Sequence, residues 1–138
     1  MEKNFKTAHG EYLLDTVRDE KMCSILERIG AYNNETTLDL LPFLMERGGV
    51  AVDVGAHVGT LAVPFSRYAG QVIAFEPSKE TFAFLQKNIH LNAANVDARN
   101  KGLGAAHDRA SSVVVHESSA AANTLMVGAG DIEISTID

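Results

Sequence analysis

Two acidic residues and two glycines near the middle of the sequence could together form a cofactor site. Asp53 ends a short apolar run, and Gly55 and Gly59 follow it within the stretch VAVDVGAHVGT. Glu76 directly follows a second apolar run, QVIAF. Glycines in such a turn let the backbone approach a ligand closely, and an acid roughly 20 residues further on suits the two ribose hydroxyls of an adenosine. The four residues therefore predict a site for a ligand that contains adenosine.

The charge of Asp53 helps to choose the ligand. A nicotinamide or flavin dinucleotide would bring its pyrophosphate to the glycine turn, where Asp53 would repel it, and the G-x-G-x-x-G spacing is absent. S-adenosylmethionine has no phosphate and carries an ammonium and a sulfonium group. One charge pair at about 4 Å and intermediate dielectric contributes roughly 4 kcal/mol before desolvation. We therefore expect S-adenosylmethionine as the cofactor, and a dinucleotide-dependent oxidoreductase is a fainter alternative.

The elements around these residues alternate between strand and helix. Residues 50–54 and 71–75 are apolar and read as buried strands, 58–69 reads as a helix, and Ser78 is placed to cap a further helix. A weaker third strand is expected at 95–100. Such alternation predicts parallel βαβ units, hence an α/β fold with a doubly wound, Rossmann-like sheet. Its order would be third, second, first strand, which leaves the first strand at an open edge.

The regions on either side of these units carry other patterns. Residues 1–49 are expected to form a helical cover, in which Gly30 ends one helix and Pro42 breaks or kinks another. Residues 50–138 would form the cofactor-binding portion. Within it, SSVVVHE and DIEISTID read as strands, and the Ala- and Ser-rich stretch at 118–122 reads as a loop.

Composition limits the partners that the chain could have. The formal net charge of -6, without a clustered excess of Lys and Arg, argues against a nucleic-acid surface. No run is long and apolar enough to span a bilayer, and the charged N-terminus is unlike a signal peptide. Cys23 is the single cysteine, and the five histidines lack metal-ligand spacing. We expect a cytoplasmic protein with no metal, no membrane contact and a small-molecule partner.

Several stretches, taken together, resemble the FkbM-type family of S-adenosylmethionine-dependent methyltransferases. VDVGAHVGT and VIAFEPSKETFAFLQKNIHLN are similar to the family's V-D-V-G-A-N-x-G turn and V-x-A-F-E-P strand end. IGAYNNETT, NVDARNKGLG and IEISTID resemble further segments of the family on either side. His57 stands where the family more often has Asn. The resemblance implies methyl transfer to a hydroxyl group of a sugar, lipid or natural product, by positioning of the acceptor in line with the methyl group.

The fold and the resemblance together define a set of expected cofactor-binding residues. Asp53, Glu76 and Ser78 also have purely structural explanations, as turn, helix-entry and capping residues, and His57 could simply shape the loop. Asn100 and Leu103 lie where the end of the third strand would approach the adenine. No general base can be named. The expected cofactor-binding residues are Asp53, Gly55, Ala56, His57, Gly59, Thr60, Glu76, Pro77, Ser78, Asn100 and Leu103.

The sequence ends at Asp138, before the fourth strand that the resemblance implies, I-K-I-D-V-E-G-x-E. We therefore expect the N-terminal half of the methyltransferase sheet. An alternative is a truncated, non-catalytic fragment that binds S-adenosylmethionine without transferring a methyl group. The open first strand, VAVDV, is apolar, so an isolated copy of the chain is expected to form a homodimer or aggregate through it.

Overall fold

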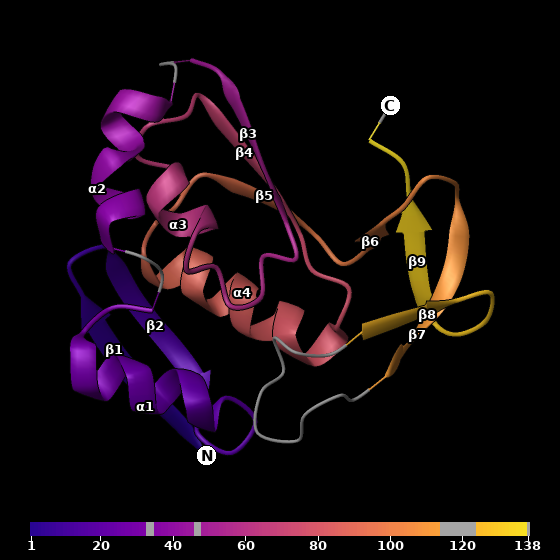
Figure 1. The fold of residues 1–138 in the computed structure, drawn as a ribbon, viewed down its shortest axis with the longest axis horizontal. Helices are drawn as coiled ribbons and strands as arrows, with labels where there is room; N and C mark the ends of the chain where they lie inside the picture. The colour runs from indigo at the N-terminus through magenta and orange to yellow at the C-terminus, as the bar shows by residue number, and fades with distance from the viewer. Residues whose placement is uncertain (33–34, 46–47, 114–123, 138) are drawn as a thin grey trace.

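The computed structural model describes residues 1–32, 35–45, 48–113 and 124–137. They form three sheets and four helices (Figure 1). The elements, in chain order, are β1 (Glu2–Thr7), β2 (Gly10–Asp15), α1 (Glu20–Ile29), α2 (Glu35–Leu44), β3 (Val50–Val54), α3 (Ala62–Phe65), β4 (Gln71–Phe75), α4 (Lys79–Leu91), β5 (Val96–Arg99), β6 (Gly102–Leu103), β7 (Asp108–Val113), β8 (Thr124–Val127) and β9 (Ile132–Ser135).

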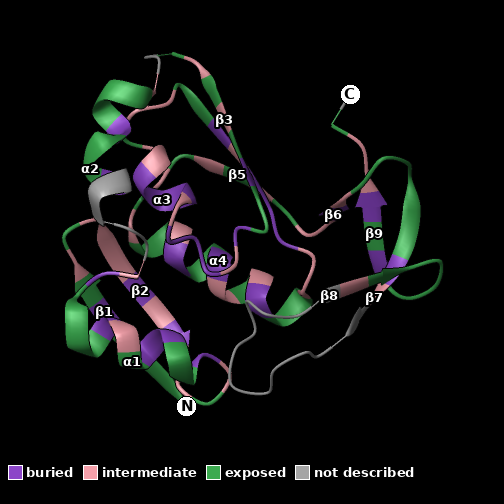
Figure 2. Cartoon of the chain, viewed as in Figure 1, coloured by how far each residue is buried: buried purple, intermediate pink, exposed green. Residues whose placement is uncertain are grey.

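The parallel sheet has the predicted strands in the predicted order. Its order is β3-β4-β5, and both pairs are parallel, so the first strand lies at an edge of the described sheet. One face packs against α3 and α4 through a cluster that includes Val72, Ala74 and Leu85. On β3 the residues of the opposite face, Val50 and Val52 among them, are exposed (Figure 2). Because the strands are parallel, Asp53 and Glu76 both lie at the carboxyl ends of the strands.

The helix after β3 is shorter than predicted. The sequence predicts helix over 58–69, whereas α3 covers Ala62–Phe65 alone. The preceding residues form the glycine turn. Pro64 lies inside this short helix, where it cannot donate a backbone hydrogen bond.

The N-terminus differs from the expected helical cover. Residues 2–15 form an antiparallel hairpin of β1 and β2, so the helical prediction is wrong there. The run GEYLLD has a period of two, with Tyr12 and Leu14 buried, and this period favours a strand. Thr7 fixes the turn, because its hydroxyl donates to Gly10 O and accepts the N–H of His9.

The two predicted N-terminal helices are present as α1 and α2. Gly30 ends α1 in the left-handed conformation and donates to Leu26 O, as the sequence predicts. α2 continues through Pro42 rather than stopping there. The hairpin and α1 share a core with the turn after β3, made of Phe5, Leu14, Met22, Cys23, Leu26 and Val58. The N-terminal segment is therefore packed directly against the region of the candidate site.

The C-terminal sheet has the order β6-β9-β7-β8, in which β9 is parallel to β6 and antiparallel to β7. Ile132 and Ile134 alternate inward on β9 and pack with Ala110, which confirms the predicted strand. The strand predicted at SSVVVHE begins earlier, at Asp108, and its residues after Val113 lie outside the described residues, as does the predicted loop at 118–122. None of the helices in the described parts is long and apolar enough to cross a membrane.

Candidate functional site

The turn after β3 is folded over the end of β4. The backbone N–H groups of Gly55 and Ala56 both donate to Phe75 O at 2.9 Å. Gly55 has a φ of 78°, and a side chain there would meet no atom within 4 Å, so the turn is open on that side. Gly59 has a φ of 94°, and a Cβ there would lie 2.9 Å from Leu85 Cδ1. The first glycine therefore leaves space beside the backbone, and the second lets α4 pack closely.

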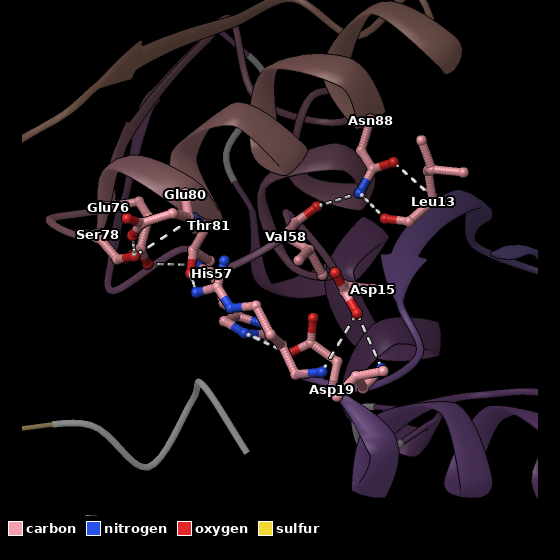
Figure 3. Close-up of polar contacts among 12 residues, drawn as sticks. Leu13, Asp15, Asp19, His57, Val58, Glu76, Ser78, Glu80, Thr81 and Asn88 are labelled. Carbon is pink, nitrogen blue, oxygen red and sulfur yellow. Dashed lines mark hydrogen bonds and ion pairs between the residues drawn. The ribbon is translucent and has the colours of Figure 1, made fainter. Parts of the chain in front are cut away.

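Glu76 joins the ends of two neighbouring strands. Its Oε2 accepts the backbone N–H of His57 and its Oε1 accepts that of Ser78, both at 2.9 Å (Figure 3). Burial raises the pKa of this carboxyl, and the two amides, with the charges of His57 and Arg18, oppose the rise. A carboxylate has about four lone-pair sites, so two donors leave room for two more. The buried acid is thus held in one orientation with free acceptor capacity.

Asp53 is the second buried acid of the site. Burial raises its pKa to about 6, the backbone N–H of Ala62 opposes this, and the nearby charge of Glu76 raises it further. Its Oδ2 is buried and has no hydrogen-bond partner among the described residues. An unpaired buried carboxylate is costly in free energy. A positively charged ligand group beside the turn would offset that cost.

His57 has an unusual backbone conformation for a residue with a side chain. Its φ is 52°, in the left-handed region, and Nε2 lies 3.2 Å from Oδ1 of Asp19. This is ion-pair distance but outside hydrogen-bond geometry, so neither ring nitrogen has a hydrogen bond within the described parts of the chain. Sequence reasoning missed Asp19. It precedes α1 far from the turn in sequence, and no local pattern connects the two.

Asn88 is another residue that the sequence reasoning missed. It is fully buried on α4, and its amide nitrogen donates to Val58 O at 2.9 Å and to Leu13 O at 3.1 Å. Its Oδ1 accepts the N–H of Leu13 at 2.7 Å. One side chain therefore ties β2 to the turn (Figure 3). A signal was present, because Asn88 lies three residues after Leu85 on the apolar face of the helix.

Of the other predicted site residues, Ser78 and Asn100 lie beside Glu76, whereas Thr60 and Leu103 lie elsewhere. Ser78 caps α4 by accepting the N–H of Thr81 at 3.3 Å, as expected. Asn100 donates to Glu76 O at 2.8 Å and Pro77 O at 3.1 Å, which brings the end of the third strand to Glu76. Thr60 instead lines a small cavity on the side of the N-terminal hairpin.

Leu103 lies in a different sheet from the turn. It belongs to β6 and pairs with Ser135 of β9. The structure thus gathers Asp53, Gly55, Ala56, His57, Glu76, Pro77, Ser78 and Asn100 at one edge of the parallel sheet. Within the described ranges, no group of three or more His, Cys, Asp or Glu side chains could hold a metal ion.

Comparisons with known proteins identify relatives of part of the chain. No family model matches the sequence. A tRNA (guanine(37)-N(1))-methyltransferase of Danio rerio is 36% identical over an alignment of 73 positions, and the match covers 48% of this chain and 15% of that protein. The chain therefore spans less than a fifth of this curated relative.

Solved structures resemble a larger share of the chain. Trm5b from Pyrococcus abyssi matches 70% of this chain and 27% of its own, with 21% identity and a TM-score of 0.54. The match to TYW2 from M. jannaschii, in complex with AdoMet, covers 70% of this chain and 42% of that protein, with 23% identity and a TM-score of 0.53. The match to TYW2 from P. horikoshii, in complex with MeSAdo, covers 73% of this chain and 36% of that protein, with 23% identity and a TM-score of 0.56. The chain has the Rossmann-like α/β fold of these proteins, over less than half of their length.

Proposed function

We propose that this chain binds S-adenosylmethionine and belongs to an S-adenosylmethionine-dependent methyltransferase. The observation that carries the proposal is the pair of buried acids, Asp53 and Glu76, at the ends of neighbouring parallel strands beside an open glycine turn. Ligands of open α/β sheets bind at this edge. The relatives with this fold include proteins crystallised with AdoMet and MeSAdo, which supports the same choice.

The residues of the site fit the two ends of this cofactor. Glu76 is held by two backbone amides and keeps acceptor capacity for the two ribose hydroxyls. Asp53 has a buried oxygen without a hydrogen-bond partner in the described structure, and the ammonium or sulfonium group supplies the missing positive charge. The open space beside Gly55 admits the ligand next to the backbone.

A dinucleotide fits the same residues poorly. Its pyrophosphate would lie on the turn beside Asp53, with Glu76 close enough to raise the pKa of that carboxyl. Two negative groups at a phosphate site oppose binding unless a cation intervenes. The chain therefore discriminates in favour of a cationic, phosphate-free nucleoside.

The chemistry requires little from this part of the protein beyond positioning. The cofactor supplies a sulfonium, which is a good leaving group, when it is bound. Asp53 and Glu76 would hold it beside the open side of Gly55, so that an acceptor could approach the methyl group in line at about 3 Å. No general base is assigned among these residues.

For the acceptor, we propose a hydroxyl group of a sugar, lipid or natural product, as the FkbM-type resemblance implies. The charge distribution favours an acceptor that is not a polyanion. Lys79, Lys87 and Lys101 each pair with a carboxylate, and the formal net charge of the chain is -6, which disfavours a phosphate-rich acceptor. The second candidate is a tRNA base, which the activity named for the Danio rerio relative supports.

Titration calorimetry tests which cofactor the chain binds. We expect S-adenosylmethionine and S-adenosylhomocysteine to bind to the chain and NAD to show no heat of binding. Selective binding of NAD would contradict the proposal and support an oxidoreductase. Transfer of a labelled methyl group to a panel of hydroxyl compounds and to tRNA then separates the two acceptor classes. Cofactor binding without transfer to either acceptor would support the non-catalytic alternative.

A further inference from the structure

Asp19 and His57 form a buried pair that links the start of α1 to the turn after β3. Their side chains are 6% and 12% exposed, and His57 Nε2 lies 3.2 Å from Asp19 Oδ1 (Figure 3). Asp19 occupies the N-cap position of α1, where aspartate side chains commonly accept a helix N–H. Its carboxylate makes no such bond. The side chain is directed to His57 instead of to its own helix.

The start of α1 does not depend on the Asp19 carboxylate. The backbone N–H of Asp19 donates to Asp15 O at 2.9 Å, and its carbonyl accepts the N–H of Cys23 at 2.8 Å. The side chain of Asp15 accepts the N–H groups of Val17 and Arg18 and so holds the preceding turn. The protein should therefore fold without the Asp19 side chain, which leaves the contact with His57 as its distinct role.

The conformation of His57 explains why such a contact would matter. A φ of 52° is unfavourable for a residue with a Cβ, and strained residues gather at functional sites. In this conformation the backbone N–H of His57 donates to Oε2 of Glu76. A contact that holds the imidazole in place therefore also holds the backbone N–H of His57, which is one of the two donors that orient Glu76.

We propose that Asp19 is a positioning residue of the cofactor site. It fixes the imidazole of His57, keeps the turn in its left-handed conformation and so holds Glu76 in the orientation that receives the ribose hydroxyls. The inference rests on the proposed function for the identity of the cofactor, but the link from Asp19 to the turn can be measured without it. Asp19 itself touches the imidazole and not the ligand.

A double-mutant cycle with S-adenosylhomocysteine tests the role of Asp19 in binding. The variants are Asp19→Ala, His57→Gly and the double variant, and thermal unfolding checks that each folds. Because directly contacting residues couple, Asp19→Ala should weaken binding about tenfold in the natural sequence and less than about twofold in the His57→Gly background. Equal losses in both backgrounds, or no loss in the natural sequence, would overturn the role. The matched control is Glu20→Ala, which removes an exposed acid next to Asp19.

A second measurement needs no ligand. Hydrogen exchange of the His57 amide should be faster in Asp19→Ala than in Glu20→Ala, and the ring nitrogen chemical shifts of His57 should change in Asp19→Ala alone. A chain that binds no S-adenosylhomocysteine but shows both changes would refute the proposed function and keep the link from Asp19 to the turn. Unchanged exchange and ring shifts in Asp19→Ala would refute the link itself.

Discussion

Glu76 accepts the backbone N–H of His57 at 2.9 Å, so the acid that follows β4 is bonded to the turn that follows β3. This bond crosses between neighbouring strands at the edge where α/β proteins bind ligands. Its partner bond, from the Ser78 N–H to Oε1, fixes the other oxygen. The carboxylate is thereby oriented before any ligand arrives, and a preorganised group loses less conformational freedom on binding.

Removal of the Glu76 side chain should weaken cofactor binding. We predict that Glu76→Ala costs about 1 to 3 kcal/mol of binding free energy, or roughly a 5- to 150-fold loss of affinity for S-adenosylhomocysteine, because charged hydrogen bonds to the ribose are lost. Titration calorimetry measures this. Glu27→Ala is the control, since Glu27 is an exposed acid that pairs with Lys3. Unchanged affinity in Glu76→Ala would show that Glu76 does not bind the cofactor.

The raised pKa of Asp53 makes the stability of the ligand-free protein depend on pH. The folded state has a pKa of about 6 for this group and the unfolded chain about 3.8, so between these values the folded state binds more protons. Stability should therefore fall as the pH rises through this window, by at most about 3 kcal/mol. Glu76, whose pKa burial also raises, contributes in the same direction.

The variant Asp53→Asn isolates this effect. Urea unfolding at several pH values should show a smaller fall in stability between about pH 4 and 6 than in the natural sequence. At neutral pH the variant should be more stable and should bind S-adenosylhomocysteine more weakly, since the ammonium loses its counter-charge. An identical pH dependence in both proteins would show that Asp53 does not carry the buried charge.

The Asn88 side chain should matter more for stability than for chemistry. Asn88→Ala leaves the buried backbone groups of Leu13 and Val58 without their partners, which should lower the free energy of unfolding by about 3 kcal/mol or more. Chemical denaturation measures the loss. Gln86→Ala, an exposed change on the same helix, should stay within about 0.5 kcal/mol. Equal stability of the two variants would contradict the assigned contacts.

The exposed face of β3 predicts self-association of the isolated chain. Val50, Val52 and Val54 are 61%, 42% and 58% exposed on a strand that pairs on one side only within the described residues. Sedimentation of the chain should show a dimer or larger species, and Val52→Lys should shift it toward monomer. Val17→Lys, at an exposed turn position, should not. A natural sequence that sediments as a monomer would refute association through β3.

Features that depend on neighbours in sequence were predictable. The parallel strands, their order, the Ser78 and Gly30 caps and the approach of Asp53 to Glu76 follow from periodicity, turn residues and the fixed handedness of βαβ units. The hairpin of residues 2–15 was also encoded locally, in the period of two at Tyr12 and Leu14. The helical pattern of the residues that follow does not extend back into this segment.

Features that depend on distant partners were not predictable. Asp19 meets His57, and Asn88 meets Leu13, only because the N-terminal segment packs on the turn and on α4. No spacing rule connects these positions. Leu103 was expected near the adenine, but the boundary between β5 and β6 puts it in the C-terminal sheet. The chain leaves the parallel sheet after Arg99 and joins β9 at Gly102, so Leu103 has surroundings that the strand prediction alone does not show.

The most direct test of the cofactor site is an NMR titration of the chain with S-adenosylhomocysteine, followed through the backbone amides. Saturable shifts should be largest at His57 and Ser78, whose amides donate to Glu76, and at Gly55 in the same turn, and small along β7 and β9; NAD should leave the same amides unchanged. An absence of saturable shifts at these three amides, or an equal response to NAD, would contradict the proposed S-adenosylmethionine site.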